Sequence, residues 1–177
     1  RTTAEAYGWH RDNTIGTTPQ DNARTEDWPA FFRDRRLAPQ LALAARNGHG
    51  GRLQRAGERL LAAIPLRLAG HAPAATLLHG DLWPGNAARL ASGEPVIFDP
   101  AVYFGDRETD LAMTELFGGF GSEFYAAYRA TWPIDAGYPV RRTLYNLYHV
   151  LNHLNLFGGG YGVQASAMIG QLLAEAR

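Results

Sequence analysis

The segment TLLHGDLWPGN, residues 76–86, places polar side chains directly after a short apolar run. Its two leucines predict a buried strand that ends at Gly80. His79, Asp81 and Asn86 follow the end of that strand, where a rigid backbone would hold them facing solvent. The segment is therefore a candidate catalytic site. The alternative is a turn in which Asp81 and Asn86 bond only to nearby backbone amides.

The composition is typical of one globular domain. The chain has 177 residues, of which 46% are hydrophobic and 19% charged, enough for a sizeable core. A formal net charge of +0 gives no reason to expect nucleic acid or an anionic membrane as a partner. The absence of cysteine excludes disulfides and cysteine–zinc sites. No apolar run approaches the roughly 20 residues that span a bilayer, and no signal-like segment is present, so we expect a cytoplasmic protein.

Helical patterns cover most of the chain. We expect Pro39 to kink or split the first long helix and Pro65 to end the second, and Ser122 to cap a later one. Residues 1–7 resemble the end of a helix and 8–25 a loop. The expected helices are 28–46, the stretch with the apolar stripe Leu53–Ile64, 108–117, 122–132, 139–157 and 163–176.

Two short strands are expected, over residues 75–78 and 96–98. The connection between them, NAARLASGEP, contains Ser92-Gly93, which favours a hairpin-like pair. The predicted fold class is α+β: a mainly helical lobe with a small β-hairpin that carries the polar loops.

Asp99 follows the second of these strands, 18 residues after Asp81. Phosphoryl transfer needs a carboxylate to orient and deprotonate the attacking hydroxyl, and oxygen ligands for magnesium. Asp81, Asn86 and Asp99 have the order that such a site requires, so the pattern favours a kinase.

Three motifs, HGDLWPGN, VIFDP and GDRETDLAM, resemble the catalytic lobe of the kinases related to aminoglycoside phosphotransferases and choline kinases. Within that superfamily the chain is most similar to the fructosamine (ketosamine) kinase family. IGTTPQ at 15–20 and DWPAFFRDRRLAPQL at 27–41 also resemble segments of that family. The resemblance extends from about Tyr7 to the last helix.

The resemblance implies ATP-dependent phosphorylation of a sugar hydroxyl on a fructosamine or other ketosamine, small or protein-bound, which leads to deglycation. It implies that Asp81 is the catalytic base and that Asn86 and Asp99 bind magnesium. His79 would support the catalytic loop. Asp110 would either cap its own helix or bind the backbone of that loop.

Fewer residues indicate how the substrate would be bound. Trp83 could stack on the sugar or simply pack the loop against the helices. Asp106 and Glu108 could meet the ammonium group of the substrate or form surface ion pairs, and for Arg107 we favour an ion pair.

Two features differ from protein kinases. Gly80 stands where those enzymes carry the arginine of His-Arg-Asp, and Pro100 replaces the phenylalanine of Asp-Phe-Gly.

The resemblance also implies an N-terminal lobe with a phosphate-covering loop and a lysine, yet all 17 basic residues here are arginine and the chain begins at Arg1. We therefore expect residues 1–177 to be the C-terminal catalytic lobe, inactive alone, with apolar surface exposed where the missing lobe docks.

Other functions remain possible on the residues alone. A metal-dependent hydrolase could use His79, Asp81 and Asp99, and His149 and His153 have the i, i+4 spacing of zinc ligands but no evident third ligand. The chain could also be another small-molecule kinase of the superfamily, or a noncatalytic remnant that binds glycated amines. The basic residues Arg33, Arg35 and Arg36 are interpreted as a solvated helix face.

Overall fold

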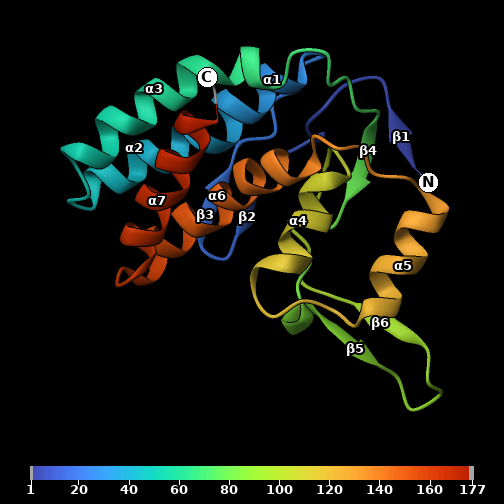
Figure 1. The fold of residues 1–177 in the computed structure, drawn as a ribbon. Coiled ribbons are helices and arrows are strands. Elements are labelled where there is room, and N and C mark those ends of the chain that lie inside the picture. Colours follow the sequence, from blue (N-terminus) through green and yellow to red (C-terminus); the bar gives the residue numbers. More distant parts are fainter. Residues whose placement is uncertain (1, 176–177) are drawn as a thin grey trace.

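The computed structural model describes residues 2–175 and has two parts, a helical body and a smaller β region (Figure 1). The helices are α1 (Trp28–Phe32), α2 (Ala38–Arg46), α3 (Arg52–Arg67), α4 (Glu108–Leu116), α5 (Ser122–Thr131), α6 (Tyr138–Phe157) and α7 (Tyr161–Ala174), with a π-helical turn at Arg33–Leu37 and a 3₁₀ turn at Pro84–Asn86. The strands are β1 (Thr3–Ala4), β2 (Asn13–Ile15), β3 (Thr18–Gln20), β4 (Ala75–Leu78), β5 (Ala87–Arg89), β6 (Pro95–Ile97) and β7 (Tyr103–Gly105). The mixed α and β content agrees with the predicted fold class.

Helix α6 is the centre of the helical body. Its leucines recur every three or four residues, which places them on one face of the helix. Leu144, Leu147, Leu151 and Leu154 are all buried, and the helix packs against α2, α4 and α7. The predicted start near Pro139 and end at Phe157 are confirmed. Within residues 2–175 no helix has both the length and the apolar character that a bilayer crossing requires.

The first long helix is split, as predicted, by a π-helical turn just before Pro39. Proline has no N–H to donate to the carbonyl four residues earlier, which is that of Arg35. The guanidinium of Arg36 donates to this carbonyl instead, at 2.9 Å. The hydrogen-bonding pattern thus changes from π-helical to α-helical just before Pro39, and the carbonyl of Arg35 still has a donor.

Arg36 is fully buried, so the interpretation of the three arginines as a solvated face is wrong for this residue. Its guanidinium stacks on Tyr103, 4.0 Å from the ring centroid, and donates to the carbonyl of Asp21 and to Oδ1 of Asn22. Arg36 lies four residues after the buried Phe32, and this spacing places it on the apolar face of the helix.

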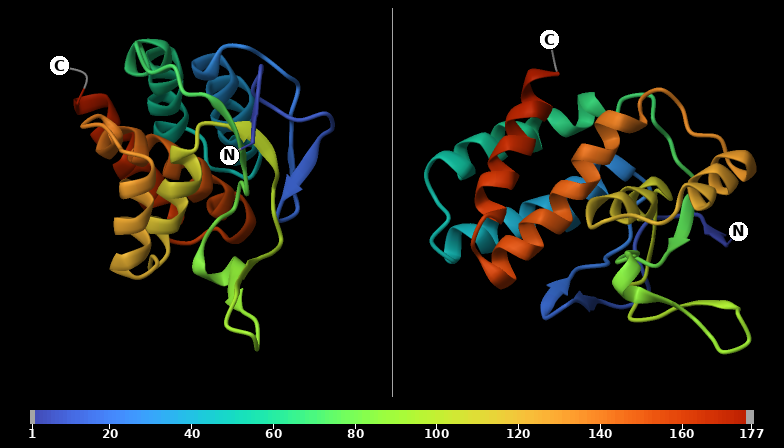
Figure 2. Two further views of the ribbon diagram at one scale, coloured as in Figure 1. Left: turned by 90° about the vertical axis from the view of Figure 1, so that its right-hand side faces the viewer. Right: turned by 60° about the horizontal axis from the view of Figure 1, so that its bottom comes forward.

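The pairing expected between residues 75–78 and 96–98 is wrong. Strand β4 has the predicted bounds, but it pairs with β1 on one side and β7 on the other. Strand β6 pairs with β5 in a separate hairpin, which projects away from the helices (Figure 2). The Ser92-Gly93 turn closes that local hairpin, whereas the β4–β7 pair joins segments that no short turn connects.

Four smaller expectations also need correction. Residues 3–4 form β1 and not a helix end, because they pair with β4. The loop expected over 8–25 contains the β2–β3 hairpin. Helix α3 continues past Pro65 to Arg67, and Gly121, not Ser122, occupies the N-cap of α5.

Candidate active site

The candidate catalytic loop, residues 79–86 and called the catalytic loop below, begins where β4 ends. Gly80 has a φ of +81°, and a Cβ there would lie 2.0 Å from the carbonyl oxygen of Ala101. Only glycine avoids both the strained backbone conformation and this clash. The arginine of protein kinases would therefore not fit at this position.

His79 joins the two polar loops that were expected to meet through a strand pair. Its Nε2 lies 2.9 Å from the carbonyl oxygen of Phe98, and because a carbonyl only accepts, Nε2 carries the proton. Its Nδ1 then accepts from the backbone N–H of Asp81 at 3.3 Å. The buried imidazole thus ties the catalytic loop to the residue that precedes Asp99.

Asn86 holds the aspartate at the centre of the loop. Its Nδ2 donates to the carboxylate Oδ2 of Asp81 at 3.1 Å and to the carbonyl of the same residue at 3.0 Å. Both partners are acceptors, so the orientation of the amide is settled. The amide Oδ1 of Asn86 has no hydrogen-bond partner within residues 2–175 and is free to bind a cation.

Asp99 is the one non-glycine residue in the described part of the chain with a positive φ, +54°. Such backbone conformations are sparsely populated and concentrate at functional sites. Its carboxylate forms no hydrogen bond with the residues described, and it lies near enough to Asp81 to raise the pKa of that group. The free amide oxygen of Asn86 and the free carboxylate of Asp99, beside the carboxylate of Asp81, match the oxygen ligands that magnesium prefers.

Burial is the main influence on the pKa of Asp81 and raises it. The hydrogen bond from Asn86 and the nearby imidazoles of His79 and His153 act in the opposite direction. His153, from α6, was not expected at this site, although the sequence had singled it out for its spacing from His149.

Asp110 fixes the start of the loop. Its two carboxylate oxygens accept from the backbone N–H groups of His79, at 2.8 Å, and Gly80, at 2.9 Å. Of the two roles considered for Asp110, the structure shows the bond to the loop backbone. Burial raises the pKa of Asp110, and these two bonds oppose that rise.

Trp83 is half-buried and lies over the loop backbone. A Cβ on Gly85 would lie 2.2 Å from its ring, and the ring lies edge to face with Phe117 at a centroid distance of 6.2 Å. Trp83 therefore packs within the protein and also leaves part of its ring accessible.

Asp106 and Glu108 are buried and fully engaged by protein groups. Asp106 contacts His71 at 2.6 Å and accepts from Tyr145 at 2.7 Å, and Glu108 accepts two bonds from Arg141 at 2.6 and 2.9 Å. Neither carboxylate is therefore open to the ammonium group of a substrate, and neither forms the surface ion pair that was the alternative. Among residues 2–175 Arg107 has no ion-pair partner; it donates to Tyr128 and stacks on Trp132.

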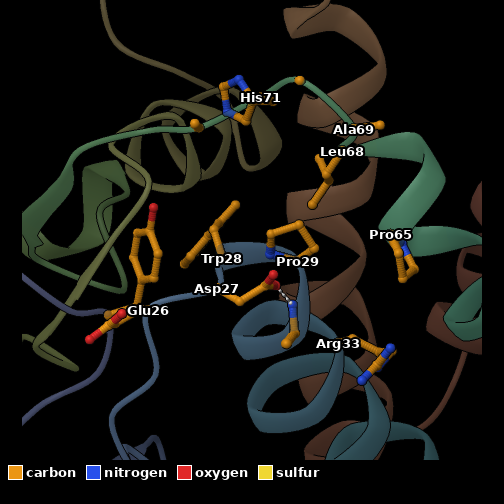
Figure 3. A pocket seen from close by; sticks show the side chains of 13 residues that line it. Glu26, Asp27, Trp28, Pro29, Arg33, Pro65, Leu68, Ala69 and His71 are labelled. Carbon is orange, nitrogen blue, oxygen red and sulfur yellow. Dashed lines mark hydrogen bonds between the residues drawn. The ribbon is translucent and has the colours of Figure 1, made fainter.

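Two hollows lie on the surface of the molecule. The pocket in Figure 3, about 470 Å³, lies between the start of α1 and the end of α3. It contains no residue of the catalytic loop and neither Asp99 nor Asp110. A mostly apolar groove of about 660 Å³ lies between the β5–β6 hairpin and the start of α5 with the segment before it, and it includes Leu82 and Pro84 of the catalytic loop.

The loop presents a half-buried carboxylate that an asparagine orients and that lies beside a second carboxylate. The chain belongs to the fructosamine kinase family, whose model matches residues 1–175. It is 52% identical over 172 residues to a probable ketoamine kinase of Synechocystis sp., covering 94% of this chain and 56% of the relative. It is 43% identical over 171 residues to a chloroplastic protein-ribulosamine 3-kinase of Arabidopsis thaliana, covering 97% of this chain and 52% of the relative.

Solved structures agree with this assignment. A protein from Haemophilus somnus classed as a fructosamine-3-kinase superposes with a TM-score of 0.88 at 29% identity, over 96% of this chain and 57% of that one. A second such protein, from Thermobifida fusca, gives 0.88 at 34% identity, over 97% and 60%. The chain thus spans little more than half the length of the relatives it matches.

Proposed function

We propose that residues 1–177 form the C-terminal catalytic lobe of an ATP-dependent ketoamine kinase. The observation that carries this proposal is the arrangement around Asp81. Asn86 donates one hydrogen bond to the carboxylate of Asp81 and one to its backbone carbonyl, and it keeps its own amide oxygen free, beside the free carboxylate of Asp99. The names of the relatives, which include ketoamine and protein-ribulosamine kinases, support this choice of substrate.

In the proposed reaction Asp81 accepts the proton of a sugar hydroxyl. The alcohol oxygen attacks the γ-phosphorus of ATP while the bond to the β-phosphate oxygen breaks, which gives a phosphorylated ketoamine, ADP and a proton. Magnesium, when bound, neutralises the developing charge on the phosphates. Asn86 and Asp99 would hold it, since both present unengaged oxygens. His79 and Asp110 keep the loop in place, so Asp81 does not need to reorganise during the transfer.

The partly accessible face of Trp83 is the proposed surface against which the sugar stacks. A ketoamine carries a sugar on an amine, and the apolar face of a sugar ring packs well on an aromatic ring. Both classes of ketoamine, those on a free amino acid and those on a protein side chain, fall within this proposal.

An N-terminal lobe would supply the groups that this chain does not contain. A kinase covers the ATP phosphates with a glycine-rich loop and binds them with a lysine, and residues 1–177 include no lysine. Ile97 and Phe98, which are 61% and 42% exposed, lie directly before Asp99 and would meet that lobe.

The proposal is tested by joining this chain to the N-terminal region of the Synechocystis relative and measuring ADP release with Nε-fructosyl-lysine. We expect turnover that requires both the ketoamine and magnesium. ADP release that does not depend on the ketoamine, or no release at all, would contradict the proposal. Ketoamine binding without turnover would favour a noncatalytic remnant.

A further inference from the structure

A third hollow, of about 240 Å³, is lined by the π-helical turn, α2, β3 and α6. Three of its nine lining residues are the arginines Arg35, Arg36 and Arg46, and none of the nine is acidic. The whole chain has a formal net charge of +0, so positive charge is concentrated here. The hollow includes no residue of the catalytic loop and neither Asp99 nor Asp110. It is therefore separate from the candidate active site.

One side of the first long helix supplies this charge. Its lining residues recur every three or four positions, which places them on one face: Arg35, Pro39, Leu43 and Arg46. The rest of the lining includes Tyr148 of α6. Burial raises the pKa of Tyr148, so its phenol stays uncharged. The lining thus contains no negative charge to balance the arginines.

Arg36 is fully buried and has only neutral acceptors. Its guanidinium donates to the carbonyls of Asp21 and Arg35 and to the amide oxygen of Asn22. Its Nε–H is buried and has no acceptor within residues 2–175. Arginine does not lose its proton in proteins, and buried charges are ordinarily paired. No carboxylate of the described residues pairs with this one.

The outer part of the hollow carries free donors. Arg35 pairs with Asp21 at 2.5 Å, and both side chains are about 40% exposed. The side chain of Arg46, at the end of α2, is exposed and has no ion-pair or hydrogen-bond partner within residues 2–175. The hydroxyl of Thr18 has no partner there either, and it is not among the buried atoms that lack one. An anion in the hollow would therefore meet both charge and hydrogen-bond donors.

We propose that this hollow binds a phosphate group, either free or esterified to a small sugar. The planar fork of N–H groups on a guanidinium matches two oxygens of a phosphate. A phosphate monoester carries between one and two negative charges near neutral pH, so it balances more positive charge than a carboxylate does. Arg36 supplies charge from within the protein, and Arg46 and Thr18 supply the free donors. None of these residues takes part in the proposed kinase reaction, so the site is independent of it.

The test is isothermal titration calorimetry on residues 1–177 at constant ionic strength, with inorganic phosphate and glucose 6-phosphate as probes and glucose as the uncharged control. We expect at least one probe to bind with a dissociation constant in the millimolar range or below. Arg46→Gln should raise that constant about 3- to 10-fold, as the loss of one hydrogen bond would. Arg59→Gln, at an exposed arginine of α3 outside the hollow, is the matched control and should leave the constant within about twofold.

Binding of inorganic phosphate supports a site for the free anion, and binding of glucose 6-phosphate alone supports a site for a sugar phosphate. No binding of either probe would overturn the inference. Binding that Arg46→Gln weakens no more than Arg59→Gln does would also overturn it, because the probe would then lie elsewhere. Should Arg46→Gln fail to fold, the NMR signal of the Arg36 Nε–H in the unmodified chain decides the matter. A shift at saturating probe supports the site, and an unmoved signal overturns it.

Discussion

Asn86 donates from a single nitrogen to both the carboxylate and the backbone carbonyl of Asp81, at 3.1 and 3.0 Å. The spacing of five residues allows this because a 3₁₀ turn at Pro84–Asn86 brings the amide back over the start of the loop. One side chain thus orients the proposed base and presents its other amide atom, an oxygen, to the position where magnesium would bind.

Replacing Asp81 by Asn tests the assignment of the base. In the joined enzyme we expect Asp81→Asn to lower turnover by about 10²- to 10⁴-fold, since a positioned general base contributes that much. The fold should persist, because the amide has nearly the same shape. A coupled ADP-release assay measures the loss, and circular dichroism checks the fold. Turnover near that of the unmodified enzyme would remove Asp81 from this role.

Asp99→Asn tests the magnesium site. Asparagine tolerates a positive φ, so the backbone at Asp99 should be retained while a charged oxygen ligand is lost. We expect half-maximal turnover to require about tenfold more magnesium. Asp34→Asn is the matched control, because Asp34 only pairs with Arg33 at the surface. An unchanged magnesium requirement in Asp99→Asn would count against this ligand.

Much of the geometry of the candidate site could be predicted from the sequence because most of its residues lie in one short segment. The residues of 79–86 are neighbours in the chain, and the strand before them is short, apolar and ended by a glycine. The way in which Asp99 reaches this loop could not be predicted. It depends on the bond from His79 to Phe98 and on the β4–β7 pair, which join distant segments, whereas the local turn signal pointed to the wrong strand partner.

The burial of Arg36 was missed for a related reason. Its neighbours Arg33 and Arg35 are partly exposed and form ion pairs. Residue type alone therefore assigns all three arginines to the same exposed face of the helix. The spacing of four residues from Phe32 and again to Gln40, both buried, was the available signal. His153 was noticed for its spacing, but its nearness to Asp81 depends on how α6 packs, which one sequence does not reveal.

Arg36→Met tests whether the buried guanidinium supports the fold. The change leaves the carbonyls of Asp21 and Arg35 and the amide oxygen of Asn22 without their donor. We expect the free energy of unfolding to fall by about 2–4 kcal/mol. Arg35→Met, which removes a half-exposed pair with Asp21, should cost less than about 1 kcal/mol. Urea denaturation measures both, and equal losses would show that Arg36 has no special role.

His149 predicts a dependence of stability on pH. Burial lowers its pKa to about 3 from an ordinary value of 6.5, and His153 and Arg36 add to this. As pH falls below 6.5 the unfolded chain binds a proton at His149 that the folded chain does not, so the free energy of unfolding declines toward pH 3. We expect His149→Phe to lose less stability than the unmodified protein between pH 7 and pH 5 in urea denaturation. Parallel losses in the two proteins would exclude His149 as the source.

The activity of residues 1–177 alone tests the division of labour between two lobes. This chain carries the proposed base and magnesium ligands, but no lysine to bind the ATP phosphates. We therefore expect weak, magnesium-dependent binding of ATP by isothermal titration calorimetry, and no detectable ADP release with Nε-fructosyl-lysine. Adding the N-terminal region of a relative, fused or as a separate polypeptide, should restore turnover, and the same addition to Asp81→Asn should not. Robust turnover by residues 1–177 alone would show that no second lobe is needed.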